Sequence, residues 1–223
     1  MNKFEDYFFN KEKVCKVHKW HHYFKIYDRH FSKFIGKNPV ILEIGVYHGG
    51  SLEMLNHYFD NKCRIYGLDI NCECLKVPFT LKATNITVVI GDQGSREFWR
   101  EFLKKTPKFD IVIDDGGHTM NQQIVTHEEV YDHISDNGVY LCEALHTSYM
   151  TDYGGGLNKP TTFIEYSKSF IDMIHFFYIK EDLQEKKQLY EKFRRTTDSI
   201  HYYDSVIVLE KKIDLHEPTA SFR

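Results

Sequence analysis

Long hydrophobic runs and a patterned set of cysteines are both missing from this sequence. No apolar run approaches the roughly 18 residues that a membrane-spanning helix needs, and the first residues, MNKFED, are too polar for a secretory signal peptide. The five cysteines are odd in number and lack CxxC spacing, which favours neither a disulfide framework nor a zinc site. We therefore expect a cytoplasmic protein with reduced, structural thiols and no membrane partner.

A strong charge of one sign is missing as well. The 29 Lys and Arg residues nearly balance the 32 Asp and Glu residues, and no block of like charge is long enough for a nucleic-acid tail or a polybasic membrane patch. The composition therefore indicates no nucleic-acid partner. The sequence does contain 42% hydrophobic residues, with 15% aromatics, which is enough for a sizeable core in one domain.

Short apolar runs alternate with helical stretches through most of the chain. This alternation is typical of βαβ units, and it predicts an α/β fold with a doubly wound, mostly parallel sheet that carries helices on both faces. Two further runs, 199–204 and 205–211, are so close that they must pair as an antiparallel hairpin. The expected parallel strands are 40–46, 64–70, 86–93, 109–113 and 138–143.

The first forty residues are rich in aromatics and histidine. Trp20, Phe24, Tyr27 and Phe31 follow a 3-4-4 spacing, which predicts one face of an amphipathic helix packed on the core. If this helix lies across the open end of the sheet, its first residues could point at a bound ligand: His21, His22 and Tyr23.

A glycine-rich turn follows the first expected strand. Gly45, Gly49 and Gly50 let the backbone turn sharply and approach a ligand, and the helix that begins after them offers unpaired N–H groups to a carboxylate or phosphate. The spacing differs from the GxGxxG of dinucleotide-binding folds, so a pyrophosphate site is not specifically indicated.

Polar residues end the next two strands. Asp69 lies about twenty residues beyond the glycine turn, where an acidic residue takes the ribose hydroxyls in βαβ nucleoside sites. Asp92 and Gln93 end the third strand and could hydrogen-bond the edge of an adenine. A strand-end aspartate is often only a turn residue, but the glycine turn makes the ribose role the better interpretation.

The segment FDIVIDDGGHTMNQQ, residues 109–123, is where we expect the chemistry. Asp114, Asp115 and His118 follow a buried strand at the edge of the sheet where ligands bind in open α/β folds. Turn formation and helix capping could also explain these residues, but the spacing of Asp115 and His118 at that edge favours a catalytic pair. The glycine-rich segment 146–156 follows the fifth strand and is a candidate substrate loop or lid, with His146, Tyr149 and Tyr153 as sugar contacts.

Taken together, these motifs resemble the class I S-adenosylmethionine-dependent methyltransferases. More narrowly, the segments 19–27, 42–51, 91–93, 113–120, 145–149 and 153–156 resemble the sugar O-methyltransferases of macrolide tailoring and their bacterial relatives, some labelled cephalosporin hydroxylase-like. The resemblance covers residues 18 to 212 and implies a seven-stranded sheet of order 3-2-1-4-5-7-6. We expect a single domain with an N-terminal helical cap (1–38), a Rossmann-like core (39–212) and a tail (213–223).

The resemblance also implies roles for individual residues. His118 corresponds to the general base of the family, working with Asp115. Asp115, Glu143 and the next position correspond to ligands of a divalent metal, magnesium or manganese, but that next position is Ala144 here. Two carboxylates plus substrate hydroxyls can still hold magnesium, which keeps several waters. The residues expected to bind S-adenosylmethionine are Glu43, Gly45, Tyr47, His48, Gly49, Ser51, Asp69, Ile70, Asp92, Gln93 and Asp114.

The implied reaction is methyl transfer to a sugar hydroxyl. The acceptor is a small molecule or glycan that carries a sugar, with a deoxysugar such as rhamnose as the first substrate to try. The sequence leaves open whether the protein forms a homo-oligomer. A catechol or other phenol is an alternative acceptor, and Ala144 leaves room for a catalytically decayed cofactor-binding module. Hydroxylase chemistry is disfavoured because no two-histidine, one-carboxylate triad is evident.

Overall fold

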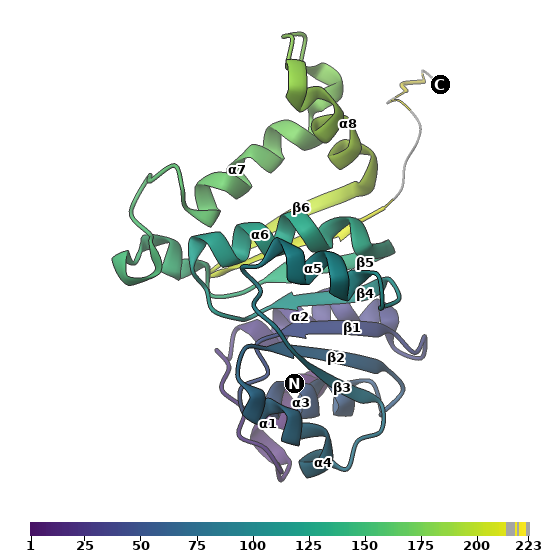
Figure 1. Ribbon diagram of the computed structural model, residues 1–223. Helices are drawn as coiled ribbons and strands as arrows, with labels where there is room; N and C mark the ends of the chain where they lie inside the picture. The colour runs from purple at the N-terminus through teal and green to yellow at the C-terminus, as the bar shows by residue number, and fades with distance from the viewer. Residues whose placement is uncertain (213–216, 218, 222–223) are drawn as a thin grey trace.

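The computed structural model describes residues 1–212, 217 and 219–221, and its centre is a seven-stranded sheet of order β3-β2-β1-β4-β5-β7-β6 (Figure 1). Strands β1 to β5 pair in parallel, whereas β7 pairs antiparallel with both β5 and β6. The predicted order and hairpin are confirmed. The strands are β1 (Val40–Ile44), β2 (Arg64–Asp69), β3 (Ile86–Ile90), β4 (Phe109–Asp114), β5 (Ile134–Cys142), β6 (Thr197–Tyr203) and β7 (Val206–Lys211).

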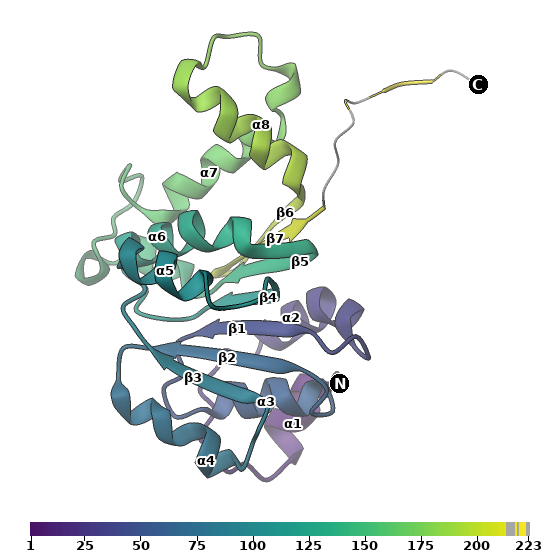
Figure 2. The same cartoon turned by 45° about the vertical axis from the view of Figure 1, so that its right-hand side comes forward.

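Helices cover both faces of this sheet, as the two views in Figures 1 and 2 show. One face carries α1 (Lys3–Asn10), α2 (Tyr23–Phe31), α3 (Gly50–Tyr58) and α4 (Val77–Leu81). The other carries α5 (Arg96–Leu103), α6 (Met120–Val130), α7 (Phe163–Ile174) and α8 (Lys187–Thr196). Short 3-10 turns occupy Ser32–Phe34, Cys72–Lys76, Tyr131–His133, Leu145–Tyr149, Thr151–Tyr153, Phe176–Tyr178 and Gln184–Lys186.

Strand β4 shows why the centre of the sheet is fully buried. Ile111 and Ile113 pack into the core on the α1–α4 face, while Val112 packs into the core on the opposite face. Because successive side chains of a strand point to opposite faces, an unbroken apolar run suits a strand covered on both sides. The polar residues that follow β4 therefore reach the edge of the sheet on a rigid support.

Helix α6 begins immediately after this edge. Thr119 is its N-cap: its hydroxyl accepts a hydrogen bond from the Gln122 backbone N–H at 3.4 Å, while the Gln122 side chain accepts one from the Thr119 N–H at 3.2 Å. This reciprocal capping box satisfies two backbone donors at the start of the helix. It fixes the chain directly behind His118.

The N-terminal aromatic stripe is only partly as predicted. Phe24, Tyr27 and Phe31 are buried in the core, but Trp20 is 58% exposed. Helix α2 begins at Tyr23, so Trp20 lies in the preceding turn rather than on the helical face that packs against the sheet. The prediction was therefore wrong for Trp20, because the 3-4-4 spacing continues back past the real start of the helix.

Two further expectations concern the chain ends and membranes. Most of the expected tail, 213–223, lies outside the described residues. Among the residues that the structure describes, no helix combines the length and apolarity needed to cross a membrane.

Candidate active site

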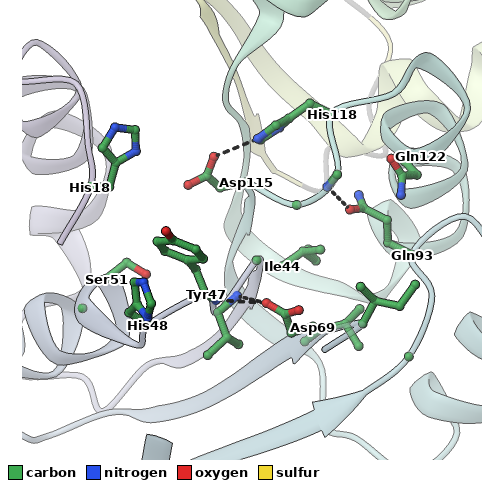
Figure 3. A pocket seen from close by; sticks show the side chains of 18 of the residues that line it. His18, Ile44, Tyr47, His48, Ser51, Asp69, Gln93, Asp115, His118 and Gln122 are labelled. Atoms are coloured by element: carbon green, nitrogen blue, oxygen red, sulfur yellow. Dashed lines mark hydrogen bonds and ion pairs between the residues drawn. The ribbon is translucent and has the colours of Figure 1, made fainter. Parts of the chain in front are cut away.

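A cavity of about 390 Å³ opens at the carboxyl ends of β1, β2, β3 and β4 (Figure 3). This is the edge where ligands bind in open α/β sheets. Most of the residues predicted to bind the cofactor line it: Gly45, Tyr47, His48, Ser51, Asp69, Ile70, Asp92 and Gln93. Asp115 and His118 line it too, together with four residues that sequence reasoning missed, Lys16, His18, Lys19 and Gln122.

The glycine turn brings two strand ends into direct contact. Gly45 has a φ of 94°, and a Cβ there would lie 2.0 Å from the backbone oxygen of Asp115. Gly49 has a φ of 82° immediately before α3. Only glycine combines this backbone geometry with such close approach, so the turn holds β1 against the end of β4.

Left-handed backbone also occurs at non-glycine residues around the cavity. Tyr47, His118 and Ala144 have φ values of 49°, 59° and 54°, and they follow β1, β4 and β5 respectively. This conformation costs free energy for a residue with a side chain and is concentrated at functional sites. It turns the chain sharply after each of the three strands that meet at the site.

Asp69 ties the cavity floor together. One carboxylate oxygen accepts the backbone N–H groups of Val46 and Tyr47 at 2.9 Å, and the other accepts that of Asn71 at 2.9 Å (Figure 3). Burial opposes ionisation, but these three backbone donors lower the pKa of Asp69 below its ordinary value. Its carboxylate stays charged and faces the cavity.

The two residues that follow β3 behave differently from each other. The Asp92 side chain is exposed and accepts the Gly94 N–H at 2.8 Å, as a turn residue does. The Gln93 oxygen accepts the Gly117 N–H at 2.7 Å, and its nitrogen donates to Asp114 at 3.0 Å. The expected use of the Gln93 amide on an adenine edge is therefore not what the structure shows, because this amide is engaged within the protein.

Asp114 also departs from its expected role in cofactor binding. Its side chain is 1% exposed, lies outside the cavity lining, and accepts hydrogen bonds from Gln93 and Tyr140. Burial raises its pKa to about 7. Asp114 supports the floor under the cavity because its strand position points it into the core.

His118 stands at the mouth of the cavity beside Asp115 (Figure 3). Its Nε2 lies 3.7 Å from an Asp115 carboxylate oxygen, and the Thr147 hydroxyl donates to its backbone oxygen at 3.0 Å. Its buried Nδ1 has no hydrogen-bond partner among the described residues. Burial lowers the pKa of His118, although Asp115 opposes this shift, so the imidazole is neutral near pH 7 and can accept a proton.

Beside this histidine, three carboxylates converge on one ammonium group, and we call Lys19, Glu43, Asp115 and Glu143 the acidic centre. The Lys19 ammonium nitrogen lies 2.6 Å from Asp115, 3.0 Å from Glu143 and 3.7 Å from Glu43. The Tyr27 hydroxyl donates to Glu143. Lys19 belongs to a motif that carried the family resemblance, but nothing in the sequence indicated where its side chain points.

Burial dominates the charges of the acidic centre. It raises the pKa of Glu43 to about 7 and, with repulsion from Asp115, the pKa of Glu143 to about 8. Burial also disfavours the charged form of Lys19, but Asp115 and Glu143 outweigh it and hold the pKa of the lysine well above its ordinary value. Lys19 is therefore an ammonium ion at every pH at which the fold is expected to operate.

The centre was also predicted to hold a divalent metal. Its donor set fits a cation, because Asp115 and Glu143 supply carboxylate oxygens and both buried oxygens of Glu43 lack a hydrogen-bond partner among the described residues. Ala144 supplies no side-chain ligand. In the structure the ammonium of Lys19 is the cation at these oxygens.

The predicted sugar-contacting residues divide into two groups. His21 packs against Phe8 and Phe9 of α1, and Tyr23 is 1% exposed beneath Ala144, so neither points into the cavity. These two predictions were wrong because His21 packs against α1, while the Tyr23 hydroxyl contacts the backbone of Ala144 and Ser205.

The other three candidates lie beside His118 or line a second cavity. The Tyr153 ring is centred 6.4 Å from the His118 ring. His146 and Tyr149 line a second cavity, of about 440 Å³, between the segment after β5, helix α7 and the β6–β7 turn. The His146 ring is centred 6.2 Å from the exposed Trp20 ring, so Trp20 also belongs to this side of the site.

No protein-family model matches the chain, but curated proteins do. Demethylmacrocin O-methyltransferase of Streptomyces fradiae is 29% identical over 198 residues, which cover 84% of this chain and 48% of that protein. Mycinamicin VI 2''-O-methyltransferase of Micromonospora griseorubida is 30% identical over 195 residues, which cover 83% of this chain and 47% of that protein. The chain thus spans about half the length of these relatives.

Solved structures agree with this similarity. The MycE methyltransferase of the mycinamycin pathway, in complex with Mg, SAH and mycinamycin VI, superposes with a TM-score of 0.78 at 28% identity, covering 95% of this chain and 53% of that one. A second crystal form, with Mg and SAH, gives a TM-score of 0.78 at 29% identity and covers 89% and 50% of the two chains.

Proposed function

Because this chain is a homologue of macrolide and tetracenomycin sugar O-methyltransferases and has the class I methyltransferase fold, we propose that it transfers a methyl group from S-adenosylmethionine to a sugar hydroxyl. The observation that carries the proposal is the placement of His118. This histidine, whose pKa is lowered by burial, lines the cavity at the carboxyl ends of β1–β4 beside Asp115, and its ring is centred 6.4 Å from the Tyr153 ring.

The first cavity suits the methyl donor. When bound there, S-adenosylmethionine supplies an electrophilic methyl group on a positively charged sulfur. The turn through Gly45 and Gly49 would receive its methionine part, and Asp69 its ribose. The adenine would lie near Ile70 and Asp92, which line the same cavity, and would contact backbone rather than the Gln93 amide.

His118 would act as the general base. A sugar hydroxyl is a weak nucleophile until its proton leaves, and a positioned base typically accelerates such a step by about 10²–10⁴-fold. The proton would pass to a His118 ring nitrogen as the hydroxyl oxygen takes the methyl group from the sulfonium sulfur, whose bond to that methyl would break to leave SAH. Asp115, 3.7 Å from the ring, would stabilise the imidazolium that results.

Asp115 and Glu143 would hold the divalent ion that the relatives suggest. Bound beside the acceptor, such an ion would lower the pKa of the hydroxyl. The acceptor itself would lie toward Tyr153 and the second cavity, where Tyr149 and Tyr202 offer aromatic surface to the apolar face of a sugar ring.

The first experiment is isothermal titration of S-adenosylmethionine and SAH into the purified protein, with and without magnesium or manganese. We expect micromolar binding, followed by methyl transfer to members of a panel of deoxysugar glycosides, nucleotide sugars and catechols. No binding under any condition would contradict the methyltransferase proposal. Transfer to catechols alone would reassign the acceptor.

A second candidate function follows from Ala144 and Lys19. If a missing metal ligand and an ammonium in the acidic centre mark a decayed site, the chain is a cofactor-binding module without transferase activity. Tight S-adenosylmethionine binding with no transfer to any acceptor, at any metal concentration, would favour this candidate.

A further inference from the structure

The Lys19 side chain is unusual for a lysine because it is only 3% exposed. Its ammonium nitrogen is 2.6 Å from Asp115 and 3.0 and 3.1 Å from the two oxygens of Glu143. Lysine is almost never buried without charged partners, and here it has them on three strand ends. The side chain is thus held as a fixed part of the acidic centre and is not a surface charge that happens to lie nearby.

The oxygens that contact Lys19 are the ones a divalent ion would need. Magnesium requires carboxylate oxygens at about 2.0–2.1 Å in an octahedral shell. An ammonium nitrogen at hydrogen-bonding distance from the same oxygens of Asp115 and Glu143 occupies that position, and two cations this close repel each other. The Lys19 ammonium and a divalent ion would therefore compete for these oxygens.

The set of ligands at the site suits an ammonium group better than an octahedral metal ion. Ala144 removes a carboxylate from the ligand set, and its backbone turns away with a φ of 54°. An ammonium group has three N–H donors and needs no octahedral shell, so Asp115 and the two oxygens of Glu143 can accept its hydrogen bonds. The Glu43 oxygens accept no hydrogen bond among the described residues, so further carboxylate oxygens remain beside Asp115 and Glu143 for a competing cation.

We infer that the Lys19 ammonium is the resident cation of the acidic centre, and that a divalent ion binds Asp115 and Glu143 only by displacing it. Lys19 then sets the metal affinity of this chain and keeps the two carboxylates in place while no metal is bound. The inference rests on the proposed function only in its choice of a divalent metal as the competing ion. Its test measures metal binding and does not depend on methyl transfer.

The test compares Mn²⁺ binding to the wild type, Lys19→Met and Lys25→Met, measured by the electron paramagnetic resonance signal of free Mn²⁺. Lys25 is an exposed lysine of α2, so its variant removes the same charge from the same segment. We expect Lys19→Met to bind Mn²⁺ about tenfold or more tightly than the wild type, and Lys25→Met to match the wild type. Equal or weaker binding by Lys19→Met, or no binding by either protein, would overturn the inference.

A second possible metal site could contribute to the measured Mn²⁺ binding and has to be removed as a control. One ligand atom from each of His30, His201 and Glu210 lies within 4.8 Å of the others, which could hold an ion. Each protein is therefore also titrated in a His201→Ala background. The affinity difference between Lys19→Met and the wild type is expected to persist there, and its disappearance would count against Lys19.

A second readout uses the wild type, in case Lys19→Met fails to fold. Acetic anhydride modifies exposed lysines, and mass spectrometry reports the extent at each one. We expect Lys19 to be protected without metal and to become modified at saturating Mn²⁺, while Lys25 is modified throughout. Saturable Mn²⁺ binding that leaves Lys19 protected would overturn the inference. Lost methyl transfer with intact cofactor binding would instead contradict only the proposed function.

Discussion

Two clusters of charged residues join the N-terminal helical segment to the sheet, and their glutamates have pKa values shifted in opposite directions. The acidic centre is one cluster. The other, which we call the hairpin cluster, consists of His30, Lys33 and Glu210. There, a His30 ring nitrogen lies 2.5 Å from one Glu210 oxygen and the Lys33 ammonium lies 2.8 Å from the other.

The pKa values of Glu210 in the hairpin cluster and of Glu43 and Glu143 in the acidic centre shift in opposite directions. In the hairpin cluster, the His30 hydrogen bond and then Lys33 outweigh burial and lower the pKa of Glu210 to about 2. In the acidic centre, burial raises the pKa of Glu43 to about 7. Glu210 is partly exposed and has two cationic partners, which favour its ionised form. Glu43 and Glu143 are buried and share one ammonium with Asp115, so their ionised forms are disfavoured. The difference indicates that the hairpin cluster stabilises the fold, while the acidic centre is maintained at a cost in stability, as functional sites often are.

The largest expected contrast is between the histidines of the two regions. His118→Ala should lower turnover by about 10²–10⁴-fold without weakening S-adenosylmethionine binding, because the base is lost and the cofactor cavity remains. His30→Ala should keep turnover but lower stability by about 1–3 kcal/mol, because Glu210 and Tyr203 lose a buried partner. Kinetics, cofactor titration and urea unfolding measure the three quantities. A His118→Ala variant that loses cofactor binding as well would show a structural role.

The next prediction concerns the stability of Glu43→Gln. Because the folded pKa of Glu43 is raised, the wild type loses stability as pH rises from about 4.5 to about 7. A neutral glutamine does not titrate, and Lys19 keeps Asp115 and Glu143 as partners. The free energy of unfolding of the variant should therefore rise relative to that of the wild type over this range, by up to about 3 kcal/mol above pH 7. Urea unfolding at pH 5, 6, 7 and 8 checks it, and a difference that is constant with pH would contradict it.

Glu210→Gln should show the opposite sign. The folded pKa of Glu210 is lowered, so its contribution is complete above about pH 4.5 and disappears as pH falls toward 2. The variant should be less stable than the wild type by about 1 kcal/mol at pH 7, since partial exposure screens the pair. Thermal unfolding at pH 3, 4, 5 and 7 should show this deficit shrinking below pH 4.5. A stability deficit that grows as pH falls would contradict the lowered pKa of Glu210 and the contrast between the two clusters.

The smallest expected effect is the pH dependence of turnover. Since burial lowers the pKa of His118 below 6.5, the rate should be flat from pH 7 to 8 and fall only at lower pH, as the base becomes protonated. The residual rate of His118→Ala should lack this acid limb. A wild-type rate that still rises between pH 7 and 8 would assign the titration to another group.

Sequence reasoning was strongest where local pattern is enough. The parallel strands and the terminal hairpin follow from local pattern, and Asp69, Asp115 and His118 line the cavity at the strand ends where they were expected. The strand order came from the family resemblance and is confirmed. Sequence reasoning was weaker for polar side chains at strand ends, which can either face the ligand cavity or hydrogen-bond within the protein. Gln93 follows β3 and Asp114 ends β4, but their side chains hydrogen-bond to each other within the protein, which the sequence did not indicate.

The sequence by itself determined the strands, the sharp turns after them and the edge of the sheet where the polar residues gather. These follow from apolar periodicity, glycine backbone freedom and the topology rules of α/β folds. Only the tertiary structure decided that Lys19 lies among carboxylates 96 and 124 residues further along the chain. No local pattern encodes that contact, because it exists only once the N-terminal segment has packed over the finished sheet.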